Sequence, residues 1–478
     1  MLVRPSFLPV LLVIFSLSCG SSESSAPKPA TACSPAVSNG SAALSGTLVL
    51  TDVSLFQTVR HDLTTPTKIP TPIIAEKGAM ARTFASVSGD IAGAGLCVEV
   101  HILDKGADRA FGTSVTAFAG ESEDNIGLSS TDIPASVLTD TATLSVNVRV
   151  AATGQSLATW PAGGKGHELL ATKEQGSLKL TLVPVAYNAD GSGRVPDLSE
   201  ENLAKYRNGI VAYYPNADVQ LTIHEPIPFD QVVAAPGNGF SGLLNKIAML
   251  RQEDKVAKDV YYIGMVAPKE TFAEFCKGGC TAGISLLGET ASSTFTRASL
   301  VTAYADDNSI GTLVHELGHA HGRQHAPCGG ASGPDEDYPH TNAAIGVWGY
   351  DFRTKKMKRP TVNKDMMSYC DPAWISDYTY AALHTRMVEV QKLTTSKPVI
   401  TPAMVRVDML DVHADGSFER TGTTEVEATM LDTQAEAAGA KGVVASSPWV
   451  AHYPHSHGGG QLVLAPSLPS SVKTLKLH

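Results

Sequence analysis

The sequence predicts a multidomain chain in which an α/β (α+β) unit lies between an N-terminal β-sandwich-like region and a small C-terminal β domain. The length of 478 residues suits about three domains of roughly 150 residues each. The 42 glycines and 28 prolines, with frequent Thr, Ser and Val, favour strands and turns. Helical and strand patterns alternate only in the middle of the chain, which distinguishes this part from both flanks.

The composition excludes two broad classes of protein. Hydrophobic residues make up 43% and charged residues 18% of the chain, which is ordinary for packed globular protein and excludes wholesale disorder. The 37 basic and 47 acidic residues leave a formal net charge of −10. No basic surface for nucleic-acid binding is therefore expected.

Residues 1–18 have the pattern of a signal peptide. Arg4 supplies the positive start, and residues 7–17 form an apolar run that is shorter than the about 20 residues of a membrane-spanning helix. Ser18 precedes Cys19, and this arrangement resembles a bacterial lipoprotein signal, in which the cysteine becomes the lipid-modified first residue. Ordinary secretion, with Cys19 removed or free, is the alternative.

Residues 19–45 are rich in Ser, Ala and Pro and have almost no large apolar side chains, as expected of a flexible tether. We therefore expect an exported protein that is lipid-anchored through Cys19 at the bacterial cell envelope or surface, or is otherwise secreted. In the anchored form, the lipid on Cys19 is expected to be the protein's contact with the membrane. Beyond the signal peptide, no segment of the sequence approaches a membrane-spanning length.

Residues 46–187 form the N-terminal region, in which strand-like runs are separated by turn-forming residues. The clearest runs are at 47–50, 97–103, 143–150 and 177–183. They predict one β-sandwich with an irregular insertion at 106–132.

Residues 188–395 form the middle unit, which begins at a segment rich in turn-forming residues, 188–196. Helices are predicted at 197–214, 241–253, from 309 onward and at 376–392. Strands are predicted at 219–223, 260–266, 283–287 and 298–304. Residues 396–478 return to strand patterns, with hairpin strands at 405–412 and 425–430 and a closing strand at 472–478.

The segment His-Glu-Leu-Gly-His-Ala-His-Gly-Arg-Gln-His, which begins at His315, carries the chemistry. It continues an amphipathic helix, and His319 lies four residues after His315, so both imidazoles leave one face and can share a tetrahedral metal. Gly322 can adopt a positive φ and turn the chain so that His325 supplies a third nitrogen. Three histidines leave a fourth position for water, which is typical of a catalytic zinc site. Glu316 lies where its carboxylate can reach that water without binding the metal.

This segment matches the zinc signature of the metzincin metallopeptidases, HExxHxxGxxH, and a second motif supports the resemblance. Met367 lies 42 residues after His325, where it resembles the Met-turn that underlies the zinc in that clan. Tyr369 matches the position at which some metzincins carry a tyrosine that binds zinc or hydrogen-bonds the reacting carbonyl; a buried phenol that only packs is the alternative. The blocks 326–330 and 374–378 look like those of a bacterial exported branch near the dictomallein-type, mucin-cleaving peptidases.

The resemblance implies a zinc-dependent metalloendopeptidase that holds one catalytic zinc and hydrolyses peptide bonds of proteins or glycoproteins. Zinc would acidify its bound water, and Glu316 would take the proton and deliver it to the leaving amine. Developing negative charge would be held by zinc and by the hydroxyl of Tyr369, where that residue is catalytic. The segment 283–287 occupies the place of the clan's edge strand in chain order, which implies pairing with an extended substrate.

Two other functions remain open from the sequence. One is a surface lipoprotein whose catalytically weak protease fold acts as a binding module, although the three histidines and Glu316 are all intact. The other is zinc-dependent hydrolysis of a non-peptide bond, against which Met367 and the extended motif weigh.

Apart from the predicted lipidation site, the chain has six cysteines, an even number that favours disulfides in an exported protein. Cys276 and Cys280 are one residue too widely spaced for a redox Cys-x-x-Cys motif, so a local structural bridge is predicted. Cys328 follows the third histidine and Cys370 follows the Met-turn, and the resemblance brings these two segments together at the zinc, so it predicts a second bridge. The pair that remains is Cys33 and Cys97.

Three further groups are weaker candidates. His321 lies within the motif but outside its ligand positions, and it is expected to face solvent or to support a ligand. The acidic run at 335–337 could bind calcium, but a solvated acidic loop is favoured. His452, His455 and His457 lie in a Gly-rich stretch and could bind a metal, but a plain surface loop is favoured.

Overall fold

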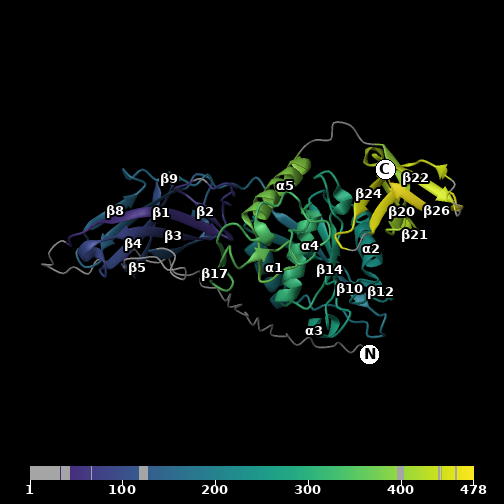
Figure 1. The fold of residues 1–478 in the computed structure, drawn as a ribbon, viewed down its shortest axis with the longest axis horizontal. Helices are drawn as coiled ribbons and strands as arrows, with labels where there is room; N and C mark the ends of the chain where they lie inside the picture. The colour runs from purple at the N-terminus through teal and green to yellow at the C-terminus, as the bar shows by residue number, and fades with distance from the viewer. Residues whose placement is uncertain are drawn as a thin grey trace, which may run out of the picture.

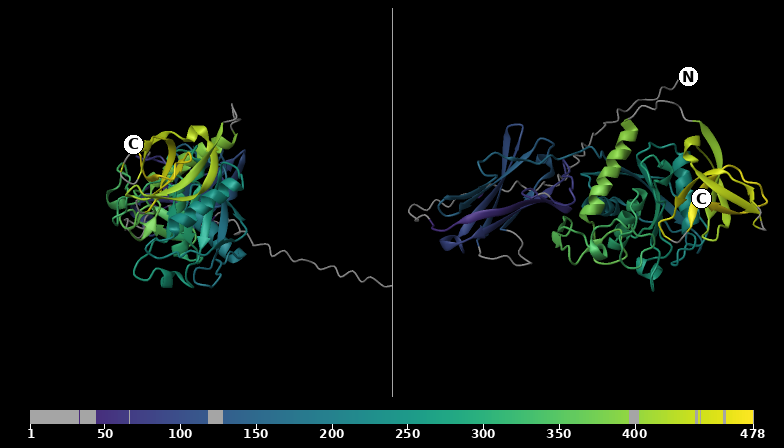
Figure 2. Two further views of the ribbon diagram at one scale, coloured as in Figure 1. Left: turned by 90° about the vertical axis from the view of Figure 1, so that its right-hand side faces the viewer. Right: turned by 45° about the horizontal axis from the view of Figure 1, so that its top comes forward.

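The computed structural model describes residues 33, 44–65, 67–117, 128–395, 403–439, 442, 444–457 and 460–477. The predicted signal peptide, Cys19 and most of the predicted tether lie outside the described residues. Within them the chain is mostly β-strand with few helices, and three parts lie in a row (Figure 1). The right-hand view of Figure 2 shows the N-terminal strands at one end of this row and the C-terminal strands at the other.

The N-terminal part contains two sheets that share one apolar core. The first sheet has the order β17-β16-β2-β1-β3-β6, with β1 Leu48–Gln57, β2 Val59–Asp62, β3 Ala79–Val87, β6 Ser129–Ile133, β16 Gly349–Asp351 and β17 Lys356–Lys358. The second has the order β5-β4-β7-β8 with β9 paired to β7, and comprises β4 Gly95–Asp104, β5 Ala107–Thr116, β7 Thr143–Val150, β8 Ser156–Trp160 and β9 His167–Glu168. In β7 every second side chain is buried, as the sequence alternation predicts.

Two features of these sheets differ from the prediction. The described part of residues 106–132 is not an irregular insertion, because it contains β5 and β6. Most side chains of β5 are exposed or half-buried, so this strand lacks the apolar run by which a strand is recognised in a sequence. The strands β16 and β17 come from the middle of the chain and extend the first sheet through β2.

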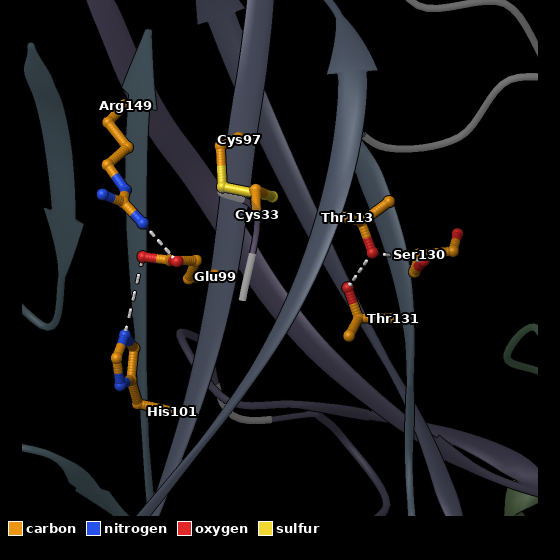
Figure 3. Close-up of a disulfide and its surroundings, with 8 residues drawn as sticks. All are labelled: Cys33, Cys97, Glu99, His101, Thr113, Ser130, Thr131 and Arg149. Carbon is orange, nitrogen blue, oxygen red and sulfur yellow. Dashed lines mark hydrogen bonds and ion pairs between the residues drawn. A yellow bond between two sulfur atoms is a disulfide. The ribbon is translucent and has the colours of Figure 1, made fainter. Parts of the chain in front are cut away.

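A disulfide joins Cys33 to Cys97 in β4 (Figure 3). Cys33 and Cys97 are the two cysteines that remain once the sequence has paired the other four. Beside it, Glu99 of β4 forms an ion pair with Arg149 of the neighbouring β7. The bridge therefore ties a residue that precedes β1 to the second sheet of the sandwich.

The middle part is built on one sheet with the order β11-β10-β13-β15-β14, in which β12 also pairs with β10. Its strands are β10 Leu178–Tyr187, β11 Val219–Ile223, β12 Ile227–Phe229, β13 Val260–Val266, β14 Gly283–Ser285 and β15 Ala298–Thr302. The pairs β10–β11, β10–β13 and β13–β15 are parallel, whereas β14 is antiparallel to β15 at the edge.

The sequence predicts a strand at 177–183 but assigns it to the sandwich, and this assignment is wrong. The strand is β10, which lies between β11 and β13 in the middle sheet. Parallel partners are joined by long crossovers, so local sequence shows that a strand exists but not which sheet it enters.

Helices cover both faces of this sheet. They are α1 Glu200–Tyr213, α2 Phe240–Glu253, the short α3 Phe272–Phe275, α4 Asp307–Ala320 and α5 Asp377–Thr395. α1, α4 and α5 share the core on one face, and α2 packs on the other. None of the described helices combines the length and the apolar character that a membrane crossing requires. The short elements are β18 Lys364–Asp365, β19 Ala373–Trp374 and the 3₁₀ turns Gly89–Ile91, Ala135–Val137, Thr294–Thr296, Thr341–Ala343 and Ala428–Met430.

The C-terminal part is a sheet with the order β21-β20-β25-β24-β22-β23, in which β26 also pairs with β22. Its strands are β20 Met404–Val412, β21 Phe418–Glu427, β22 Thr433–Gly439, β23 Val444–Ser446, β24 Trp449–Pro454, β25 Gln461–Ala465 and β26 Val472–Leu477. Met409 and Leu464 share the apolar core that surrounds Leu244 of α2. The rings of Tyr453 and Phe295 stack with centroids 5.8 Å apart. These contacts fix the C-terminal sheet to the α2 side of the middle part.

A buried lysine fixes the sandwich to the middle part. Lys77 Nζ donates hydrogen bonds to the carbonyl oxygens of Val211 and Tyr214, both at 2.7 Å, at the C-terminal end of α1. The last carbonyls of a helix have no partner within it and favour a cationic donor. Burial lowers the pKa of Lys77 to about 7.

Candidate active site

α4 presents the histidine motif from a helix whose other face is held in the core. Asp306 caps the helix by accepting a hydrogen bond from the backbone N–H of Ser309. The predicted apolar stripe is buried and consists of Ile310, Leu313, Val314 and Leu317. This stripe sets the rotation of the helix and thus the direction in which His315 and His319 leave it.

The three motif histidines converge on one point. His319 Nε2 lies 3.1 Å from His315 Nε2 and 3.2 Å from His325 Nε2. A tetrahedral zinc with bonds of about 2.0–2.1 Å to nitrogen holds its ligand atoms about 3.3 Å apart. The donor set and its spacing therefore fit a metal ion of this kind.

The other ring nitrogen of each histidine is anchored to the backbone. Each Nδ1 donates a hydrogen bond to a carbonyl oxygen, which leaves the Nε2 lone pair free for a metal. The acceptors for His315, His319 and His325 are the carbonyl oxygens of Met366, Arg323 and Ser332, at 2.7, 2.6 and 2.6 Å.

Burial favours the neutral form of these imidazoles. It lowers the pKa of His315 and holds the pKa of His319 well below its usual value. Burial together with the neighbouring His315 lowers the pKa of His325 to about 4. Neutral imidazole is the form that binds a metal.

We expect metal binding to persist below the ordinary histidine pKa of 6.5. Protons compete with the metal for the ring nitrogens, so the metal is lost only as the pH falls through the lowered pKa values of the ligands. Metal content after dialysis should stay near one ion per chain at about pH 6 and fall as the pH approaches about 4. Loss of half of the metal already near pH 6.5 would contradict this expectation.

Gly322 makes the turn that brings His325 to the other two histidines. Its φ is +81°, in the left-handed region that the sequence predicts. A Cβ at this position would lie 2.4 Å from the carbonyl oxygen of Gly288. Both the backbone conformation and the space therefore require glycine.

Met367 packs against α4 and supports the site. The residue is 1% exposed, and a Cβ on Gly318 would lie 2.5 Å from Met367 Sδ. Met367 N–H donates to Asp365 Oδ1 at 2.8 Å, and Ala326 N–H donates to the Met367 carbonyl at 3.0 Å. This turn thereby holds the chain that follows His325.

Glu316 is buried, and both of its carboxylate oxygens accept hydrogen bonds. His457 Nε2 lies 2.9 Å from Oε1, and Ser456 Oγ donates to Oε2 at 3.2 Å. Burial alone would raise the pKa of Glu316, but the charge and hydrogen bond of His457 outweigh it and lower the pKa. Gly283 leaves room for this side chain, because a Cβ there would lie 2.6 Å from Glu316 Cγ. Glu316 is therefore ionised and able to accept a proton.

Tyr369 directs its hydroxyl toward the histidine cluster. The hydroxyl is hydrogen-bonded to His457 Nδ1, and the ring centroid lies 4.8 Å from that of His325. The side chain is 44% exposed, so it is not a buried phenol. Partial burial and the charge of Glu316 raise the pKa of Tyr369 to about 12, so the phenol keeps its proton and can donate it in a hydrogen bond.

The structure corrects the interpretation of His452, His455 and His457 as a plain surface loop. One ligand atom of His457 and one from each motif histidine lie within 4.8 Å of one another. His455 is buried, whereas His452 in β24 lies outside the cluster. Sequence reasoning missed His457 because it is 141 residues beyond Glu316 and follows no recognisable spacing. The grouping of histidines was the signal that the sequence offered.

His321 is a core residue, so the expectation that it could face solvent is wrong. Its ring is buried and stacks on Tyr261 with centroids 4.4 Å apart. Its Nδ1 donates to the carbonyl oxygen of Leu317 at 2.8 Å. Burial lowers the pKa of His321 to about 3, and the neutral ring is outside the metal-binding group.

The acidic run at 335–337 is partly engaged in holding the chain beyond the third histidine. Asp335 accepts hydrogen bonds from Arg323 at 2.8 Å and from the Tyr378 hydroxyl at 3.0 Å. Glu336 and Asp337 are exposed. Within the described part of the chain, the potential metal-binding group consists of four histidines and includes none of these carboxylates, so nothing supports a calcium site here.

Two disulfides lie near the site, and both have the predicted pairing. Cys276 is bonded to Cys280, and Cys328 to Cys370. The second bridge joins the chain that follows the third histidine to the chain that follows the Met-turn.

Replacement of Cys328 and Cys370 by serine is expected to lower the free energy of unfolding by about 2–4 kcal/mol. The bridge closes a loop with a sequence separation of 42, so its loss increases the conformational freedom of the unfolded chain. Chemical denaturation of the metal-loaded protein measures the change. The matched control replaces Cys276 and Cys280, whose separation is 4, and should lose less stability; equal losses would count against the loop-entropy explanation.

An open cleft of about 750 Å³ adjoins the cluster. Its walls include Glu316, Tyr369 and His457, together with Gly283 at the start of β14. A ligand in this cleft would therefore touch the carboxylate, the phenol and the edge strand at once.

The outer edge of β14 is partly paired with the C-terminal sheet. Ser285 N–H donates to Ser456 Oγ at 2.8 Å, and Ser456 N–H donates to the Ser285 carbonyl at 2.9 Å. Leu287 N–H donates to the Pro454 carbonyl at 3.0 Å. The predicted edge strand at 283–287 thus adjoins the cleft at its Gly283 end.

Comparison with known families supports a peptidase. Residues 297–394 match the model of the family described as Peptidase M66. This segment contains the three motif histidines, Glu316, Met367 and Tyr369, but not His457. No curated protein matches the chain. The family match and the histidine cluster together support a metallopeptidase domain in the middle of the chain.

Proposed function

We propose that this protein is an exported, zinc-dependent metalloendopeptidase with a metzincin-like catalytic domain. The observation that carries the proposal is the convergence of three imidazole Nε2 atoms beside the ionised carboxylate of Glu316, at the wall of an open cleft. The packing of Met367 against α4 and the antiparallel β14 at the edge of a parallel sheet support the metzincin-like fold.

Zinc suits this donor set. Three histidine nitrogens leave a further coordination position, as catalytic zinc sites require. Zinc bound there lowers the pKa of a water molecule and polarises the scissile carbonyl.

The chain's own residues perform the proton chemistry. Glu316 accepts a proton from the attacking water and passes it to the amine that leaves. Tyr369, whose hydroxyl stays protonated, donates a hydrogen bond to the carbonyl oxygen as negative charge develops on it. The carboxylate thus acts on the water and the leaving amine, and the phenol acts on the carbonyl oxygen.

The substrate that we propose is an extended segment of a protein or glycoprotein. A strand added to a sheet edge gains backbone hydrogen bonds. The Gly283 end of β14 lines the cleft, whereas Ser285 further along this edge is already paired with Ser456. The blocks 326–330 and 374–378 look like those of a bacterial exported branch near the dictomallein-type, mucin-cleaving peptidases, and this resemblance favours glycoproteins.

We further propose that the protein acts outside the cytoplasm, held to the bacterial envelope by a lipid on Cys19. The sequence of the first 19 residues and the three disulfides support this location, because disulfides persist in oxidising compartments.

A cleavage profile of the zinc-loaded protein, freed of its signal segment, tests the proposal. Incubation with a peptide library and with a mucin-type glycoprotein should give cleavage at defined sites, and a zinc chelator should stop it. Binding without cleavage of either would favour the alternative of a protease fold that serves as a binding module.

A further inference from the structure

The C-terminal β domain reaches the active site through the tip of the β24–β25 hairpin, residues 455–457, here termed the hairpin tip. This tip holds both carboxylate oxygens of Glu316, through His457 Nε2 at 2.9 Å and Ser456 Oγ at 3.2 Å. A carboxylate only accepts, so His457 Nε2 carries a proton and donates it to Glu316, while Nδ1 of the same ring is hydrogen-bonded to the Tyr369 hydroxyl. His457 therefore links the base of the proposed reaction to its phenol.

The hairpin tip is fixed by contacts that do not involve the His457 side chain. The backbone and side chain of Ser456 pair with Ser285, and the Pro454 carbonyl accepts from Leu287. On either side of the tip, β24 and β25 contribute to the apolar core shared with α2. The imidazole is thus presented by a scaffold that is anchored to the middle part.

This arrangement suits a permanent part of the site. His457 lines the cleft together with Glu316, and its side chain remains 18% exposed. The cleft keeps its volume of about 750 Å³ with the hairpin tip in place. Removal of the tip would break its pairing with β14 and disturb a shared apolar core.

We propose that His457 is a positioning residue of the active site, which orients the Glu316 carboxylate toward the attacking water and holds the Tyr369 hydroxyl beside it. The inference rests on the proposed function, in which Glu316 moves the proton. Proton transfer needs the acceptor at hydrogen-bond distance and in the right orientation, so a carboxylate that is free to rotate transfers less efficiently. Catalysis then depends on the C-terminal domain, although the family match ends at residue 394.

The His457→Ala variant should lower kcat roughly 10–100-fold and leave KM and zinc content unchanged, because the cleft and the three motif histidines remain. His457→Gln keeps an N–H donor for Glu316 and should recover part of the lost rate. The matched control is His413→Ala, which removes an exposed histidine of the same domain and should leave kcat unchanged. If His457 had a purely structural role, the His457→Ala and His457→Gln variants would not differ in kcat alone.

Two kinetic results would overturn the inference. Unchanged kcat in His457→Ala would show that Glu316 needs no partner, and increased kcat would show that the hairpin tip obstructs the site. If the wild type cleaves no substrate, the proposed function fails, and the inference is then judged on the cobalt(II)-substituted proteins. Their visible absorption spectra should differ between wild type and His457→Ala, because Glu316 beside the metal loses its partner; identical spectra would refute the positioning role.

Discussion

The Glu316→Ala variant is expected to lose peptide cleavage almost completely while keeping its zinc and its fold. Glu316 is the buried, ionised carboxylate beside the histidine cluster, and His457 lowers its pKa despite burial. A general base contributes about 10²–10⁴-fold to a rate, and loss of the base itself should lie at the upper end of this range or beyond. Its oxygens are not among the atoms of the potential metal-binding group, so the zinc content should stay near one per chain.

Two further variants separate the loss of the base from other effects. Glu316→Gln keeps the size of the side chain and its packing against Gly283, and it should be as inactive as the alanine variant. Tyr369→Phe should cause a smaller fall, because it removes a single hydrogen-bond donor from the developing oxyanion. The measurement is kcat/KM on one cleavable peptide, with zinc determined in each protein. Near wild-type activity in both Glu316 variants would eliminate the proposed mechanism.

The His319→Ala variant should lose most of its metal and, as a result, its activity. His319 is the central member of the cluster, since its Nε2 lies 3.1 Å from that of His315 and 3.2 Å from that of His325. The two motif histidines that remain do not make the three-ligand set of the proposed zinc site, and Nε2 of His457 is engaged by Glu316. A metal that binds the folded chain also stabilises it, so the melting temperature should fall as well.

Metal analysis of the purified proteins checks this expectation, and His321→Ala is the matched control. His321 is also buried and lies two residues further along the chain, but it is outside the metal-binding group. The control should lose the stacking on Tyr261 and some stability, yet keep its metal. Full metal retention in His319→Ala, or equal loss in both variants, would overturn the assignment of the ligands.

Local patterns in the sequence are sufficient to predict those elements and site residues that lie close together along the chain. The strands at 143–150, 219–223 and 260–266 have the bounds that the sequence predicts, because alternating or continuous burial is encoded within each segment. The spacing of His315 and His319 predicts one helix face, and Gly322 has the positive φ that the turn to the third histidine requires. The disulfide Cys276–Cys280 follows from the close spacing of its cysteines, and Cys328–Cys370 follows from the resemblance, which brings their two segments together.

Sheet membership could not be predicted in the same way. The sequence predicts the strand β10 but assigns it to the sandwich, and it does not predict that β16 and β17 extend the first sheet. Strand pairing between distant segments depends on which apolar faces meet in the folded chain, and that information is spread over both partners.

The metal-binding motif, the carboxylate that we propose as the base and the turn that completes the motif could be predicted from the sequence, because all three are set by spacing on one helix and the segment that follows it. The position of His457 beside Glu316 could not be predicted in this way. Its own neighbourhood, a histidine followed by glycines, has the composition of a surface loop. The residue reaches Glu316 because β24 and β25 pack in a core shared with α2, and because Ser456 pairs with Ser285 at the sheet edge. Such contacts join residues that are far apart along the chain, so they exist only after the middle and C-terminal parts have packed together.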